Sequence, residues 1–144
     1  MTARRSLRVA VSAAAVVGLA ALALTGCVGG SELITQSSAS GHILMSDARH
    51  AEPVTSDRIE GTLTVVGSCF GLDTGTGSFA AIFPQGSGII EGTEQVAVPG
   101  WGTLGLGNRY QGGGGVMESA TLSYHDAIPV ECLAARMIVL YPLR

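Results

Sequence analysis

The stretch Gly61–Phe83, GTLTVVGSCFGLDTGTGSFAAIF, decides the fold class. Its first part, GTLTVVGSCF, alternates apolar Leu63 and Val65 with polar Thr62 and Thr64, and its last part, SFAAIF, alternates in the same way. A period of two residues is typical of a β-strand with one buried face. The run GLDTGTG between the two parts is a turn signal because glycine interrupts strands. The stretch therefore predicts two strands joined by a glycine-rich turn.

The same pattern continues toward the end of the chain. Four further short apolar segments follow, separated by Gly- and Pro-rich turns such as PQGSG, PGWG and GGGG: EQVAVP, GTLGLG, ATLSY and ARMIVLYPL. Sixteen of the 21 glycines lie between Gly61 and Gly115, and glycine in strands marks the bends that a small barrel needs to close. The sequence predicts an all-β domain over residues 59–144. We expect a five- or six-stranded OB-like barrel, with an open β-sandwich as the alternative.

The N-terminal segment, residues 1–26, is typical of an export signal. Three arginines and no acid precede an uncharged apolar run, Val9–Leu24. This is the charged start and apolar centre of a secretory signal helix. The run is shorter than the roughly 20 residues that a permanent membrane helix needs. The pair Arg4-Arg5 faintly matches a twin-arginine signal, but the general secretory route is favoured because two early arginines are common.

The end of this signal, Leu24-Thr25-Gly26-Cys27, resembles the lipobox of bacterial lipoproteins. The resemblance implies that Cys27 is linked to a diacylglycerol and that the chain is cleaved just before it. Two acyl chains hold a protein stably on a membrane. We therefore expect an exported protein whose partner is the lipid bilayer and whose domain lies on the extracytoplasmic side of the cell membrane.

Residues 27–58 are predicted to be a flexible tether between the anchor and the domain. They are rich in Ser, Gly and Ala and show no sustained helical or strand period. The short apolar patch His42–Met45 within the tether could dock on the domain.

The cysteines predict a disulfide. Once Cys27 carries lipid, Cys69 and Cys132 remain as an even pair, and such a pair outside the cytoplasm indicates a disulfide. Cys69 ends the first predicted strand and Cys132 precedes the last. These two strands commonly lie near one another in a closed barrel.

A thiol-dependent hydrolase is the alternative use of Cys69. The run GSCFG matches the pattern of a nucleophile elbow, and His125 with Asp73 or Asp126 could complete a triad. The elbow needs a strand, a turn and a helix, whereas LDTGTGS is a poor helix. The disulfide is therefore favoured.

Composition excludes several partners and cofactors. Without residues 1–26, five arginines stand against eleven acids, a net charge of about −6, and nucleic-acid binding needs a basic surface. The three histidines are scattered, so no metal site is expected. The run GWGTLG matches a nucleotide loop literally, but no helix is predicted after it, so no cofactor is expected.

The candidate ligand surface comprises Trp101, Asn108, Arg109 and Tyr110. Exposed aromatic rings here could stack on a saccharide or a peptide, although packing within the fold is the commoner role. The segments GTLTVVGSCFGLDTG, FAAIFPQGS and VAVPGWGTLGLGNRYQGGGG are together similar to small bacterial envelope domains, a resemblance that implies no particular activity. We expect a non-catalytic binding or structural module of the cell envelope, with an envelope protein or a saccharide as ligand.

Overall fold

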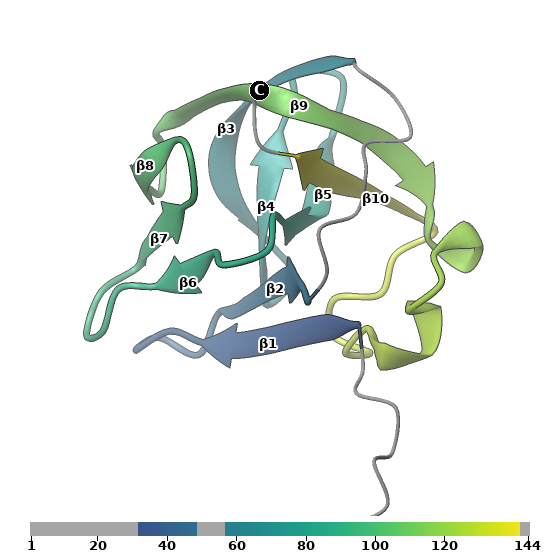
Figure 1. Ribbon diagram of the computed structural model, residues 1–144, viewed down its shortest axis with the longest axis horizontal. Helices are drawn as coiled ribbons and strands as arrows, with labels where there is room; N and C mark the ends of the chain where they lie inside the picture. The colour runs from purple at the N-terminus through teal and green to yellow at the C-terminus, as the bar shows by residue number, and fades with distance from the viewer. Residues whose placement is uncertain (1–31, 49–56, 142–144) are drawn as a thin grey trace, which may run out of the picture.

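The computed structural model describes residues 32–48 and 57–141, and these form strands and two short 3-10 helices (Figure 1). The strands are β1 Leu33–Ser37, β2 Ile43–Asp47, β3 Arg58–Val66, β4 Cys69–Asp73, β5 Ser78–Phe83, β6 Gly88–Ile89, β7 Gln95–Val98, β8 Gly102–Gly105, β9 Arg109–Glu118 and β10 Arg136–Tyr141. The 3-10 helices are η1 Ser119–Thr121 and η2 His125–Ala127. The all-β prediction is confirmed. Within these residues, no helix has the length and hydropathy to cross a membrane.

Seven strands form one large mixed sheet in the order β1-β2-β4-β3-β9-β10-β5. β10 and β2 each pair with β5 in parallel, β2 pairs with β4 in parallel, and the other pairings of this sheet are antiparallel. β4 also pairs with β5, so the pairings run from β4 through β3, β9, β10 and β5 back to β4. β6, β7 and β8 form a second, antiparallel sheet.

The flexible-tether prediction is wrong for residues 32–48. β1 and β2 pair with each other, and β2 joins the large sheet through β4 and β5. Leu44 and Met45 of β2 are fully buried and belong to two different core clusters. The patch His42–Met45, which could dock on the domain, does so, with Ile43, Leu44 and Met45 in strand β2. The folded domain thus includes Leu33, well before the predicted start near residue 59.

The first predicted strand is in fact a hairpin. β3 ends at Val66 and β4 begins at Cys69, so Cys69 opens the second strand and does not end the first. Gly67 makes the turn between them with a φ of 63°, in the left-handed region that glycine adopts readily. Apolar residues flank this short turn directly on both sides, Val65-Val66 before it and Cys69-Phe70 after it, so the sequence reads as one continuous strand.

The run Gly112–Gly115, predicted to be a turn, lies inside β9. A Cβ atom on Gly112 would overlap the hydroxyl oxygen of Tyr110. A Cβ on Gly114 would lie 2.6 Å from the carbonyl oxygen of Val139 on β10. Glycine is required here because neighbouring groups approach the strand closely.

The prediction of a strand at ATLSY is also wrong, because the 3-10 helix η1 covers the start of this segment.

The core consists of two buried clusters. One contains Leu44, Leu63, Phe70, Leu72, Ala81, Phe83, Val96, Val98, Leu104, Tyr110, Ile138 and Leu140. The other contains Leu33, Met45, Cys69, Ala80, Ile82, Leu122, Ile128, Cys132, Met137, Val139 and Tyr141. Adjacent residues of β2, β4, β5 and β10 contribute to opposite clusters, because successive side chains of a strand point to opposite faces. The large sheet is therefore buried on both faces along these strands.

Candidate functional site

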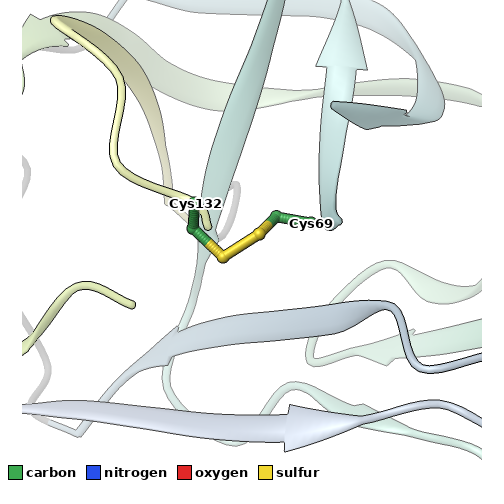
Figure 2. Close-up of a disulfide and its surroundings, with 2 residues drawn as sticks. All are labelled: Cys69 and Cys132. Atoms are coloured by element: carbon green, nitrogen blue, oxygen red, sulfur yellow. A yellow bond between two sulfur atoms is a disulfide. The ribbon is translucent and has the colours of Figure 1, made fainter. Parts of the chain in front are cut away.

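The predicted disulfide is confirmed. Cys69 and Cys132 are bonded through their sulfur atoms, with their Cα atoms 5.5 Å apart and 63 positions apart in the sequence (Figure 2). Both residues are buried. The bond ties the first residue of β4 to the irregular segment that precedes β10. The remaining cysteine, Cys27, and the rest of the signal and lipobox prediction lie outside the described residues.

The alternative catalytic residues do not form an elbow in this structure. Cys69 opens a strand, and its sulfur is bonded to Cys132, so it carries no thiolate in this form. His125 lies in η2, where its Nδ1 is 3.0 Å from the carbonyl oxygen of Ser119. Asp73 ends β4, and Asp126 lies in η2. A hydrolase based on Cys69 would require the reduced form of the protein.

The predicted ligand surface is divided by the fold, and the expectation that Tyr110 belongs to it is wrong. Tyr110 is buried, and its hydroxyl lies 3.3 Å from the carbonyl oxygen of Tyr141 and 3.4 Å from that of Gly113. Burial raises the pKa of Tyr110 to about 12. Trp101 is 38% exposed, and its ring lies 5.2 Å from the Tyr110 ring, centroid to centroid. Trp101 thus covers Tyr110 from solvent.

Asn108 shapes a turn. Its side-chain Oδ1 accepts a hydrogen bond of 2.8 Å from the Gly105 N–H, and its own N–H donates to the Gly105 carbonyl. Such a bond from an Asn side chain to the nearby backbone is typical of turns. Asn108 therefore has a structural role that the sequence prediction did not include.

Arg109 belongs to a charged network on the outer face of β3 and β9. Its Nη2 lies 2.6 Å from Oε2 of Glu60, and the Nε of Arg58 lies 3.3 Å from Oε1 of the same carboxylate. Gln111 donates a further hydrogen bond to Glu60. The Gln111 hydrogen bond, followed by that of Arg109, lowers the pKa of Glu60. Arg109 itself is exposed, so it stays accessible to a ligand.

An open groove of about 490 Å³ lies next to Asn108 and Arg109. It is lined by Thr62, Leu63, Thr64, Val65, Asp73, Leu106 and Gly107. The turn that follows β8 is held on β3, because the Gly107 N–H donates to the Leu63 carbonyl and the Leu63 N–H donates to the Asn108 carbonyl, both at 2.9 Å. Thr62 lies opposite Asp73 on β4 and opposite Arg109 on β9. The groove is thus lined by two threonines, one aspartate, three apolar residues and one glycine.

Sequence reasoning missed this groove. Thr62 and Thr64 were identified only as the polar positions of an alternating strand, and Leu106 only as an apolar position of another. The pairing of β3 with the segment around Asn108 brings these residues together across more than forty positions of the chain. No local pattern records that contact.

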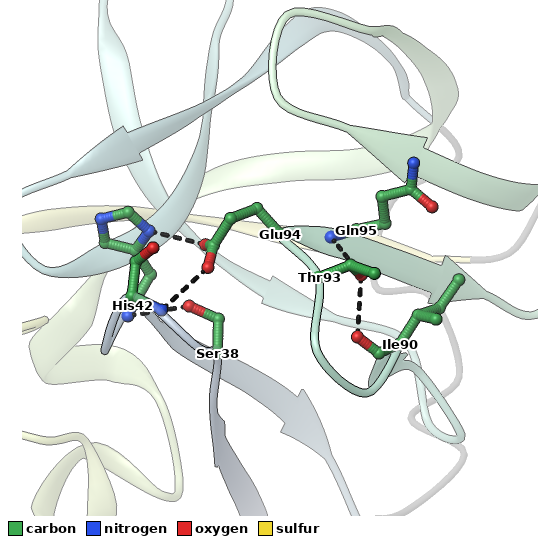
Figure 3. Close-up of polar contacts among 7 residues, drawn as sticks. Ser38, His42, Ile90, Thr93, Glu94 and Gln95 are labelled. Carbon is green, nitrogen blue, oxygen red and sulfur yellow. Dashed lines mark hydrogen bonds and ion pairs between the residues drawn. The ribbon is translucent and has the colours of Figure 1, made fainter.

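A second polar contact joins the β1–β2 turn to the β6–β7 loop (Figure 3). His42 Nδ1 donates to Oε2 of Glu94 at 2.8 Å, and the Ser40 N–H donates to Oε1 of Glu94 at 3.0 Å. The His42 ring also meets Phe70 edge-on, with centroids 5.9 Å apart. Thr93 fixes the loop, because its hydroxyl donates to the Ile90 carbonyl. The contact therefore connects the small sheet to the large one.

The Glu94 contact makes stability depend on pH. The His42 hydrogen bond, followed by the Ser40 N–H, lowers the pKa of Glu94 from its ordinary 4.5 to about 2. A carboxyl group with a lowered pKa stabilises the fold above its unfolded-state pKa and loses that contribution as the pH falls toward the folded-state value. Wild type should therefore have a higher free energy of unfolding than Glu94→Gln. This difference should be largest above pH 4.5 and should shrink between pH 4.5 and about 2. Urea unfolding across this range measures it.

The His42→Ala variant tests the cause of this dependence, because it removes the largest influence on Glu94 while the carboxyl group stays. Its stability should fall less steeply than that of wild type as the pH drops through the same range. A wild-type advantage over Glu94→Gln that stays constant from pH 4.5 to 2 would contradict the assignment.

In the part of the chain that the structure describes, no three His, Cys, Asp or Glu side chains gather to hold a metal ion.

Comparisons of the chain with protein-family models, curated proteins and solved structures found no significant match.

Proposed function

We propose that this protein is an exported bacterial lipoprotein, anchored by a lipidated Cys27, whose β-domain is a non-catalytic binding module. The Cys69–Cys132 disulfide is the observation that carries the export part of the proposal, because disulfides persist in oxidising compartments and are rare in the cytosol. The sequence around Leu24–Cys27 supports the anchor. The two lines of support agree, since lipidation of Cys27 accounts for the one cysteine that the disulfide leaves over.

The proposed architecture of the large sheet is a five-stranded OB-like barrel made of β3, β4, β5, β9 and β10. Two observations support closure. The pairings among these strands return to their starting strand, and β5 and β10 are the one parallel pair in that circuit. β2 pairs with both β4 and β5 outside this circuit, β1 pairs with β2, and β6–β8 form a separate small sheet.

Intact-mass measurement tests the anchor and the disulfide together. Protein purified from membranes without reductant should begin at Cys27, carry a diacylglyceryl group, and contain no free thiol. The Cys27→Ala variant should lose the lipid and keep the disulfide. Lipid that persists in Cys27→Ala would contradict the anchor. Two free thiols in the unreduced protein would contradict the disulfide and favour the hydrolase based on Cys69 and His125.

We propose a saccharide as the ligand of the groove, with Arg109 beside it, because Arg109 lies opposite the lining residue Thr62. The hydroxyls of Thr62 and Thr64 both donate and accept hydrogen bonds, and the Asp73 carboxylate accepts them, which suits a ligand rich in hydroxyl groups. Binding sites typically combine a few such polar groups with apolar surface, here exposed Leu106. An envelope protein is the other candidate ligand.

The double variant Thr62→Val/Thr64→Val should lose most saccharide binding. Valine keeps the shape and strand preference of threonine but removes both hydroxyls, and two hydrogen bonds of about 1 kcal/mol each correspond to about a thirtyfold weaker affinity. Thr103→Val on β8 is the matched control, because Thr103 is an exposed strand threonine outside the groove. Calorimetric titration with soluble cell-wall glycan fragments measures both. Equal affinity in the double variant and the control would exclude the groove as the site.

A further inference from the structure

We propose that the domain docks on the lipid bilayer through the loop that carries Val130 and Leu133, so that the protein lies on the membrane in one orientation. The inference rests on the proposed lipid anchor at Cys27 and goes beyond it. An anchor alone would attach the domain to the membrane and leave its orientation free.

The connection between Cys27 and the fold is short. β1 begins at Leu33, whereas the sequence predicted a tether of about 30 residues. An extended chain advances at most about 3.6 Å per residue, so Leu33 lies within about 20 Å of Cys27. The bilayer surface must therefore be close to the part of the domain where β1 starts.

The loop with Val130 and Leu133 belongs to that same part of the domain. The Ser123 hydroxyl donates to the Glu32 carboxylate at 2.8 Å, directly before β1. Leu33 also belongs to the same buried cluster as Ile128 and Cys132. In Figure 1 the yellow-green segment that follows β9 lies beside the start of β1, whereas β7 and β8 lie on the opposite side of the view. The short connection thus holds this segment toward the bilayer.

The loop presents apolar side chains on a rigid support. Val130 is 79% exposed and Leu133 is 42% exposed. Between them, Cys132 is fixed by the disulfide, and its N–H donates to the Pro129 carbonyl at 2.8 Å. Burial of exposed apolar groups at the headgroup boundary drives interfacial membrane binding. A rigid loop gains from this burial without first losing conformational freedom.

The contact is shallow and depends on the anchor. Glu131 lies between the two apolar residues and is exposed, so its carboxylate must stay at the level of the headgroups or in water. Two apolar side chains bind a bilayer weakly on their own. The anchor raises their effective concentration at the surface, which makes a weak contact persist. The net acidic charge favours zwitterionic over anionic lipid for this contact.

Tryptophan fluorescence tests the orientation with a matched pair of variants. Leu133→Trp and Leu106→Trp are each made with Trp101→Phe, which removes the one native tryptophan. Leu106 and Leu133 are both 42% exposed. Leu106 precedes β9, whereas Leu133 precedes β10, whose Arg136 pairs with Glu118 at the far end of β9. β9 has ten residues, so its two ends lie about 30 Å apart along the strand.

The lipidated full chain is reconstituted in phosphatidylcholine vesicles that contain brominated acyl chains. The L133W fluorescence should be largely quenched and shifted to shorter wavelength, and the L106W fluorescence should match that of the protein in detergent. Equal quenching of both variants would overturn the docking proposal. Iodide in the aqueous phase gives a second readout. If iodide quenches the L133W fluorescence on vesicles and stops doing so only when a second membrane protein is added, the docking proposal is also overturned, in favour of a protein partner.

Flotation of the same vesicles separates this inference from the proposed anchor. Protein that fails to float with the vesicles contradicts the lipid anchor itself. Protein that floats and leaves L133W unquenched retains the anchor and contradicts the docking loop alone. The disulfide content of each variant, measured by thiol titration, verifies that the loop keeps its structure.

Discussion

Leu44→Ala is expected to lower the free energy of unfolding by about 2–5 kcal/mol, the range for removing a fully buried leucine side chain. Leu44 is fully buried and packs in the cluster that contains Phe70 and Phe83. It belongs to β2, which pairs with β1 on one side and with β4 and β5 on the other. A cavity at this position therefore weakens contacts among several strands. Urea unfolding of the unreduced protein measures the loss.

Ile34→Ala is the matched control. Ile34 lies on β1, within the same predicted tether, but it is 45% exposed, and its truncation should change stability by about 0.5 kcal/mol or less. Leu44→Met keeps the side-chain volume and should cost less than Leu44→Ala, which gives a folded variant if the alanine variant does not fold. If Leu44→Ala is as stable as Ile34→Ala, residues 32–48 do not belong to the core, and the original tether prediction is correct.

The error in the tether prediction has a physical cause. β1 and β2 have five residues each, LITQS and ILMSD, so neither is long enough to show several repeats of a two-residue period. β2 is buried on both faces, because Leu44 and Met45 enter different clusters. A strand buried on both faces shows no alternation. The polar turn between the strands then gives the segment the composition of a linker.

The segments that were predicted well are those with one exposed face or a strong apolar run. β3 keeps polar residues on its outer side, and its alternation identified it. β10, with Met137 to Tyr141 buried, was identified by its uninterrupted apolar sequence. β9 was missed where it contains four glycines, because the need for close approach to Tyr110 and β10 depends on contacts between distant segments.

In the candidate site, too, some features could be predicted from the sequence and others could not. The Cys69–Cys132 pair followed from the parity of the cysteines and needed no geometry. The aromatic surface did need geometry, because only the packing of Trp101 over Tyr110 decides which ring is exposed. Residue type thus predicted the covalent bond, whereas exposure depended on the assembled fold.

Removal of the disulfide is expected to have the second large effect on stability. The double variant Cys69→Ala/Cys132→Ala should lose about 4 kcal/mol of unfolding free energy in the chain-entropy description of a loop of this length. That is a large share of the roughly 5–15 kcal/mol that stabilises a typical domain. The dependence of unfolding on urea concentration should also steepen, because an unfolded chain without the cross-link exposes more surface. Cys27→Ala is the control, since it leaves the disulfide intact.

The disulfide can stabilise the protein in two ways, and the regions of the domain that become less stable without it distinguish them. Cross-linking restrains the unfolded chain, which affects the whole domain, but Cys132 also holds the irregular segment before β10 against β4. Hydrogen exchange of the double variant should therefore accelerate most between η1 and β10 and less in β3 and β9, where ladder hydrogen bonds remain. An oxidised wild type and a double variant of equal stability would contradict a stabilising disulfide. A uniform acceleration would assign the effect to the unfolded state alone. A local acceleration would mean that the bond also holds the Val130–Leu133 loop in the conformation proposed to meet the bilayer.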